Sequence, residues 1–161
     1  MKKYFALALA GIFSLLVLTG CAQEPEVITL THPAGVSNIH ALDLNTEGDL
    51  GDMSVFESPL TKDGKPYGEM LGTMTKVGQL GQGTHPEREE RLLNAVFDLP
   101  DGEITVMGIS YYVPSATKLE KNEPVSRAIV GGTGAYAGVQ GEVITTHNAD
   151  DTYTHQIRIT K

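Results

Sequence analysis

The sequence predicts an all-β domain whose strands close into a barrel, and three observations support this. Apolar side chains alternate with polar ones along most of the 161-residue chain, which is the period of a half-buried strand. No segment between residues 30 and 161 keeps a 3.6-residue apolar period. The chain also has eighteen glycines, which in strands mark bulges and bends at barrel corners.

The clearest strand signal is at the C-terminus. Residues 140–147 are rich in β-branched side chains, and residues 148–151 (Asn-Ala-Asp-Asp) have turn chemistry. In the segment that follows, every second residue falls on one face: Tyr153, His155, Ile157 and Ile159. This part of the chain is therefore predicted to form a hairpin.

The other strands are predicted from the same alternation and from the turns between them. Pro100-Asp101-Gly102 reverses the chain after an alternating run, and Asp63-Gly64-Lys65-Pro66 does so earlier. Further strands are expected at residues 27–31, 36–45, 53–60, 67–80, 93–99, 104–112 and 126–130. Seven to nine antiparallel strands protect their edges most simply by closing into a barrel. A barrel of about eight strands has an interior filled by side chains or holding one small ligand.

The first twenty residues have the order of a secretory signal, with Lys2 and Lys3 before an apolar run and small residues before Cys21. Leu18-Thr19-Gly20-Cys21 resembles the lipobox of bacterial lipoproteins, which implies lipidation of the Cys21 thiol and cleavage before it. Cys21 is the only cysteine, so it has no disulfide partner within the chain. The alternatives are an ordinary signal peptide with an accidental cysteine, or an uncleaved anchor.

These features give an expected organisation of signal peptide (1–20), lipidated N-terminus and tether (21–35) and barrel domain (36–161). The expected location is the cell envelope, with a lipid anchor in the membrane. In a host with two membranes, the residue after the cysteine, Ala22, implies the outer membrane. Removal of residues 1–20 changes the formal net charge from −8 to −10, because they carry two lysines and no acidic residue. Such an acidic domain is not expected to bind nucleic acid.

Two segments resemble the allene oxide cyclase and dirigent barrel superfamily. Gly131-Gly132-Thr133-Gly134, with Tyr136 two residues later and Gly141 opening the next strand, is similar to its glycine signature. The segment 51–61 resembles its second strand. The resemblance covers most of residues 36–161 and implies an eight-stranded antiparallel β-barrel that forms dimers or trimers.

The resemblance also implies a site. Asp43 and Asn45 match a carboxylate and an asparagine that point into the lumen in the cyclases, and period two places both on the face of Ile39. They could equally lie near a strand end and bind the backbone. Glu57 falls where dirigent proteins often carry an aspartate, so the predicted catalytic residues are Asp43, Asn45 and Glu57.

Four residues are predicted to bind a ligand. Phe56 matches a lumen aromatic of the cyclases. Ser58 stands where the cyclases hold a water molecule with an asparagine, so it departs from their pattern. Tyr111 and Tyr136 could line the pocket, although they could equally fill the core. Two positions depart from the dirigent pattern, because Gln140 replaces an arginine and Ala135 an acid.

Three functions remain open from the sequence. The first is a cofactor-free cyclase or isomerase that acts on a small lipophilic, oxygenated molecule; the second is a binding protein for such a ligand. The third is a structural envelope lipoprotein whose lumen is filled by its own side chains. No cofactor or metal site is expected, because Gly132-Thr133-Gly134 lacks the lysine of a phosphate loop and the five histidines are interpreted as scattered surface residues.

Overall fold

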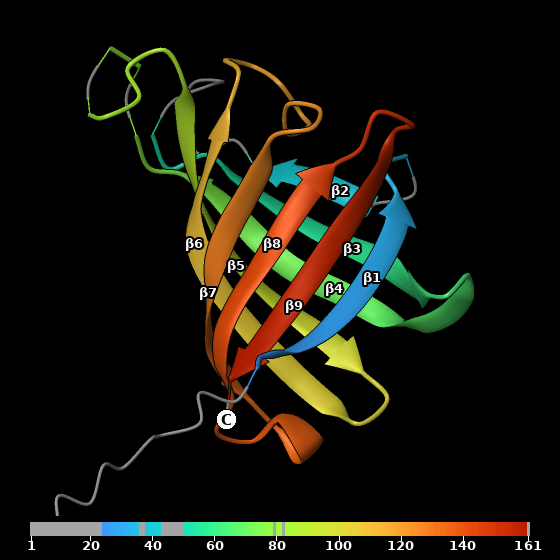
Figure 1. Cartoon of the computed structure of the whole chain (residues 1–161). Helices are drawn as coiled ribbons and strands as arrows, with labels where there is room; N and C mark the ends of the chain where they lie inside the picture. The colour runs from blue at the N-terminus through green and yellow to red at the C-terminus, as the bar shows by residue number, and fades with distance from the viewer. Residues whose placement is uncertain (1–23, 36–37, 43–49, 79, 82, 161) are drawn as a thin grey trace, which may run out of the picture.

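The computed structural model describes residues 24–35, 38–42, 50–78, 80–81 and 83–160. Within these ranges the chain forms one nine-stranded sheet that wraps into a barrel (Figure 1). The elements are β1 (Glu26–Pro33), β2 (Asn38–Leu42), β3 (Met53–Lys62), β4 (Lys65–Lys76), β5 (Glu89–Leu99), β6 (Gly102–Tyr112), β7 (Pro124–Gly132), the short 3₁₀ helix η1 (Gly134–Tyr136), β8 (Gln140–His147) and β9 (Thr152–Thr160). No helix in this part of the chain is long and apolar enough to span a membrane.

The strands pair in the order β1-β9-β8-β7-β6-β5-β4-β3-β2, and β1 also pairs with β3. All of these pairings are antiparallel, and Thr31 opposite Thr61 closes the ring. Their hydroxyl oxygens lie 2.9 Å apart. β2 pairs with the other half of the same edge of β3. The predicted eight-stranded antiparallel barrel is therefore confirmed, with β2 as one extra strand.

The barrel begins earlier in the chain than the expected boundary at residue 36. β1 pairs with β9 along its whole length, from Glu26 to Pro33. Its inward side chains Ile28 and Leu30 are buried, and burying apolar side chains is what stabilises such a strand. Much of the segment assigned to the tether is therefore a wall of the barrel.

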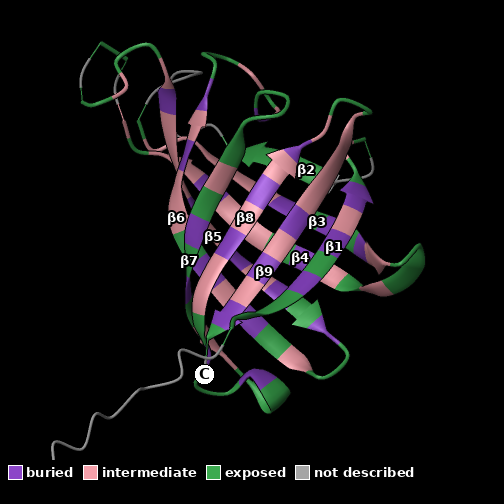
Figure 2. Cartoon of the chain, in the orientation of Figure 1, coloured by how far each residue is buried: buried purple, intermediate pink, exposed green. Residues whose placement is uncertain are grey.

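Buried residues alternate with more accessible ones along the strands, as Figure 2 shows for β7, β8 and β9. The face predicted for the last strand is confirmed, since His155, Ile157 and Ile159 are all buried. Asp63 and Gly64 both have positive φ, as a two-residue hairpin turn of the primed type requires. The Asp-Gly dipeptide thus fixes the register of the β3–β4 hairpin.

The Gly-Gly-Thr-Gly segment forms a tight corner at one end of the barrel. A Cβ at Gly134, where φ is +57°, would lie 2.4 Å from the carbonyl oxygen of Asp101 in the β5–β6 turn. Thr133 and Ala135 donate backbone hydrogen bonds to Glu103 and Asp101 of the same hairpin. These glycines therefore allow close approach of two backbones.

Candidate functional site

The barrel encloses a cavity of about 70 Å³ whose lining comes from all nine strands and from the segment 113–123 between β6 and β7. We call this segment the strap. The strap contributes Thr117 and Leu119 to the lining. The cavity therefore opens toward the barrel end where β6 finishes and β9 begins, and the strap lies over it.

The wall formed by β3, β4 and β5 is mostly apolar. Phe56, Met70, Met74 and Leu93 all line the cavity and are buried. A Cβ at Gly72 would lie 2.8 Å from the Phe56 ring, so the glycine leaves room for the ring against β4. We call this side of the lumen the apolar wall.

The opposite side, built from β6 to β9, carries a buried arginine. Arg127 of β7 donates from Nε and Nη2 to the hydroxyl of Ser110, at 3.1 and 2.7 Å. Its Nη1 donates to the hydroxyl of Thr145 at 3.0 Å. A Cβ at Gly108 would lie 3.1 Å from Arg127 Cγ, so Gly108 provides space for the arginine stem. The three polar residues form a network across three strands.

The charge of Arg127 is not matched by a carboxylate in the described structure. Of the four arginines in the chain, Arg88, Arg91 and Arg158 each form an ion pair with a glutamate, and Arg127 forms none. Arg127 is only 6% exposed, and burial lowers the pKa of its guanidinium. An arginine remains protonated in proteins even so. Among the described residues, the positive charge in the lumen therefore has no carboxylate partner.

His155 of β9 extends the network. Its Nδ1 lies 3.0 Å from the hydroxyl oxygen of Thr145. Burial lowers the pKa of His155 well below the ordinary value of 6.5, and the neighbouring His32 and Arg127 lower it further, so its ring is neutral at pH 7. Its Nε2 is buried and has no hydrogen-bond partner. An unsatisfied buried polar atom of this kind calls for an explanation.

Aromatic rings stack beside this network. The His32 ring lies 5.2 Å from those of both Tyr153 and His155, with interplanar angles of 24° and 14°. Phe97 meets His155 edge-on at 5.4 Å. His32, Tyr153 and His155 all line the cavity. We call the network together with the rings of His32, Tyr153 and His155 the polar wall.

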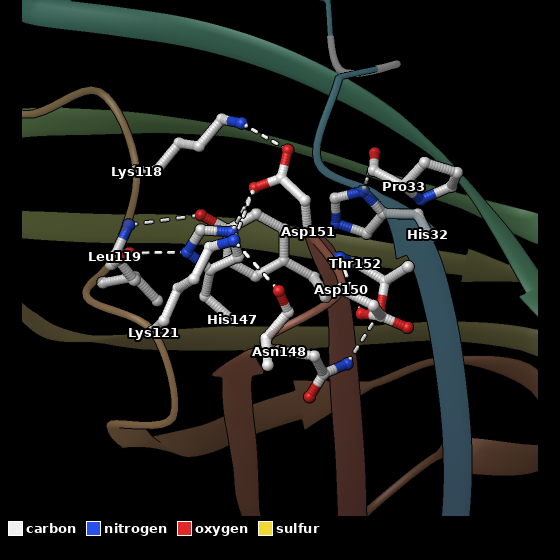
Figure 3. A network of polar contacts seen from close by, with 12 residues as sticks. His32, Pro33, Lys118, Leu119, Lys121, His147, Asn148, Asp150, Asp151 and Thr152 are labelled. Carbon is white, nitrogen blue, oxygen red and sulfur yellow. Dashed lines mark hydrogen bonds and ion pairs between the residues drawn. The ribbon is translucent and has the colours of Figure 1, made fainter.

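The strap is fastened to the barrel rim beside the polar wall. The backbone N–H of Leu119 donates to Tyr153 Oη at 3.2 Å. His147 Nδ1 lies 2.7 Å from the Leu119 carbonyl oxygen and its Nε2 lies 2.9 Å from Asp151 (Figure 3). Lys118 donates to the other Asp151 oxygen at 2.8 Å. Lys118 and His147 lower the pKa of Asp151 to about 2.

The structure separates the residues predicted for the site. Phe56 and Ser58 line the cavity. Glu57 lies between them in sequence, and the alternation of the strand turns its exposed side chain to the outside of the barrel. Its expected place in the lumen is therefore corrected. Asp43 and Asn45 lie outside the described residues, so their role stays a prediction.

Neither predicted tyrosine lines the cavity. Tyr111 is half-buried, and its ring lies 4.1 Å from that of His85. Tyr136 is buried in η1, beside the Gly-Gly-Thr-Gly corner. Burial and the nearby Tyr67 raise the pKa of Tyr136 to about 12. The tyrosines that do line the lumen are Tyr112 and Tyr153.

The residues of the polar wall are not among those predicted for the site from the sequence. In Val125-Ser126-Arg127-Ala128-Ile129, alternation places Arg127 on the face of two apolar residues, and this pattern could have indicated an inward charge. The interpretation of the histidines as surface residues is also corrected, because three are buried: His32, His147 and His155. No cluster of three metal-ligating side chains occurs among the described residues.

Comparison of the sequence with family models and with curated proteins gives no match. Among solved structures, the chain is similar to pyocyanin demethylase, with a TM-score of 0.67 and 24% identity over 84% of this chain and 100% of that one. It is also similar to AbnU, an exo-specific intermolecular Diels-Alderase, with a TM-score of 0.53 and 13% identity over 83% and 98% of the two chains. The chain therefore shares the β-barrel fold of these two proteins.

Proposed function

We propose that this chain is an envelope lipoprotein whose barrel lumen binds a small lipophilic, oxygenated molecule. The observation that carries the proposal is the cavity, which is apolar on one wall and has a few polar groups on the other. Binding sites for small molecules commonly have this composition, with apolar side chains providing contact and a few polar groups fixing orientation.

The structural neighbours support the class of ligand. One is described as a demethylase of pyocyanin and the other as a Diels-Alderase, so both act on small organic molecules. Because the likeness is one of fold, it supports a lumen that holds a small molecule. It does not identify the molecule or assign a reaction.

A second candidate function is a cofactor-free cyclase or isomerase. The observation that favours it is the convergence of donors at Arg127 and His155, because fixed donors stabilise negative charge that develops on a substrate oxygen. Glu57 faces outward and cannot contribute there. We place binding first because it requires only the cavity.

The anchor is part of the proposal. Cys21 and the lipobox-like residues before it lie outside the described residues, and the sequence pattern supports their role. In the bacterial host, radiolabelled palmitate should enter the wild-type protein and should not enter Cys21→Ala. Equal labelling of both would contradict a lipid anchor on this cysteine.

The lumen can be tested with two substitutions on neighbouring residues of β3. Ser58→Phe places a ring into the cavity, whereas Glu57→Phe places the same ring on the outer face. We expect native mass spectrometry of the detergent-solubilised protein, purified gently from its host, to show an extra mass of small-molecule size. The extra mass should be kept in Glu57→Phe and lost in Ser58→Phe.

Thermal unfolding of both variants provides the folding control. An apo mass for the wild type, together with no uptake from a library of lipophilic compounds, would contradict ligand binding. That result would favour a structural lipoprotein.

A further inference from the structure

The charge of Arg127, which has no carboxylate partner in the part of the chain that the structure describes, points to the chemistry of the ligand. We propose that Arg127 and His155 form an oxyanion site, and that the ligand is a flat conjugated monoanion, such as an aromatic carboxylate or a phenolate. This inference rests on the proposed function and makes it more specific. Three independent features of the polar wall support it.

The first feature is the number of donors on Arg127. A guanidinium has five N–H groups, and Ser110 and Thr145 accept three of them. Two N–H groups therefore remain without a described protein acceptor, one on each terminal nitrogen. A carboxylate accepts two parallel hydrogen bonds from such a pair. The two hydroxyl groups thus hold Arg127 and leave one N–H on each terminal nitrogen to bind the two oxygens of one carboxylate.

The second feature is the charge itself. Removing a cation from water without a counter-ion has a large free-energy cost. The other three arginines are paired with glutamates, so this chain does supply carboxylates to its arginines elsewhere. At Arg127 the described structure supplies hydroxyl groups alone. A ligand anion would provide the missing charge and would lower the free energy of the complex.

The third feature is the proton on His155. Arg127 can only donate, so Thr145 Oγ1 accepts its hydrogen bond and can donate its own hydroxyl hydrogen to Nδ1 of His155. A neutral imidazole with an accepting Nδ1 carries its hydrogen on Nε2. That Nε2 is the buried atom without a partner. The orphaned atom is then a second donor for the ligand oxygen, oriented by the same hydroxyl that orients Arg127.

The rings around the site set the shape of the ligand. His32, Tyr153 and His155 stack with interplanar angles of 24° or less, and Phe56 and Met74 line the cavity on the apolar wall. A flat conjugated ring packs against stacked rings in the offset geometry that aromatic pairs prefer. A saturated ring of the same size is thicker and lacks this interaction. The ligand is therefore expected to be planar near its anionic group.

Binding of matched compounds tests the inference on the detergent-solubilised full chain. Benzoate and 2-naphthoate are compared by calorimetry with their amides, which keep the ring and lack the charge, and with decahydro-2-naphthoate, which keeps the charge and lacks planarity. We expect at least one aromatic acid to bind about tenfold or more tightly than its amide, and 2-naphthoate more tightly than its saturated analogue. This comparison uses the wild-type protein, so it does not depend on how a variant folds.

Variants then assign the effect to residues. Arg127→Met should remove the preference for the acid over the amide, and His155→Phe should reduce it severalfold. The matched control Arg158→Met, on the half-buried arginine of β9 that pairs with Glu142 outside the lumen lining, should keep the wild-type preference. Isotope-edited infrared spectra of the ¹³C-carboxylate of the bound acid should show the shift of a bidentate guanidinium contact in the wild type.

The outcomes separate the two proposals. Equal affinity for acid and amide would overturn the oxyanion site and leave lumen binding standing. Equal affinity for the planar and saturated acids would overturn the conjugated class. An unchanged acid preference in a folded Arg127→Met would overturn the role of Arg127. If no acid and no amide of either size binds, this inference falls, and native mass spectrometry of the wild type decides the proposed function separately.

Discussion

The apolar wall and the polar wall face each other across one lumen and differ in what they contribute to the molecule. The apolar wall buries Phe56, Met70 and Met74, and each such side chain stabilises the fold by about 1.5–3 kcal/mol. The polar wall buries Arg127 and His155 at the same barrel end. Burial of a charge without a counter-ion and of an orphaned donor opposes folding.

The buried polar side chains of the polar wall lie at the strap end of the barrel. Along β9 the inward side chains change from Tyr153 and His155 near the strap to Ile157 and Ile159 at the other end. Along β8, the inward side chain nearer the strap is Thr145, and the next one away from the strap is Val143. The strands of the polar wall can thus carry an apolar core. Their polar residues lie where the cavity is, which indicates that they serve the site at the expense of stability.

The largest expected effect comes from making the polar wall apolar. We expect the quadruple variant Ser110→Ala, Arg127→Met, Thr145→Val and His155→Leu to raise the free energy of unfolding of the ligand-free protein by about 1–4 kcal/mol, as replacement of buried ionic networks by apolar residues can do. All four positions change together so that no hydroxyl or ring nitrogen is left without its partner. Urea unfolding measures the change.

The control for this variant is Arg158→Met, whose exposed ion pair with Glu142 should be worth about 1 kcal/mol or less. A quadruple variant that folds but is less stable than the wild type would contradict the claim that the polar wall lowers stability. The polar network would then stabilise the ligand-free barrel, and no ligand would be needed to explain why these polar groups are buried.

A smaller effect concerns acidification. Burial lowers the pKa of His155 and of His32 below the ordinary value of 6.5, so the unfolded chain binds protons that the folded chain does not. The stability from the neutral rings is fully present above pH 6.5 and is lost as the pH falls below it. One proton corresponds to about 1.4 kcal/mol per pH unit.

Urea unfolding between pH 7.5 and pH 5.5 checks this expectation. The free energy of unfolding should fall less steeply with acidification in His155→Gln than in the wild type. Identical slopes for wild type and His155→Gln would show that His155 takes up a proton in the folded barrel, against its assignment as a neutral donor.

The two walls also differ in how far the sequence predicts them. Strand alternation predicts the barrel because every strand has one buried face. The structure has Phe56 and Ser58 buried in β3 and Glu57 exposed between them. The same alternation gives β7 its inward face. The alternation also predicts a strand at 27–31, but the expected domain boundary at residue 36 leaves it outside the barrel, whereas β1 pairs with β9 along its whole length.

The network of the polar wall depends on the sheet register, which decides which residues of neighbouring strands lie side by side. No local sequence pattern gives this register. Arg127 meets Ser110 and Thr145 from the two neighbouring strands, and the β6–β7 register shifts between Thr105 and Val106. The family resemblance points instead to carboxylates such as Glu57, whose side chain faces outward. The strap shows no periodicity at all, and its position over the lumen follows from contacts with His147 and Tyr153.

The smallest expected effect is on the strap, which covers the polar wall. Asp151→Asn removes the charge that holds Lys118 and His147 and keeps a side chain suited to the positive φ of this position. Asp151 is ionised down to its lowered pKa of about 2, so these contacts hold above about pH 4 and weaken as the pH falls toward 2. Exposed ion pairs contribute little to stability because water screens them, so opening should be faster by at most a few fold. We expect amide hydrogen exchange at neutral pH to accelerate by this factor at Leu119, whose N–H binds Tyr153, and to stay unchanged in β8 and β9.

The neighbouring variant Asp150→Asn, which affects contacts with Thr152 within the turn, should leave Leu119 exchange as it is. Equal acceleration in both variants would mean that the turn as a whole positions the strap, and the strap would then belong to the scaffold of the barrel.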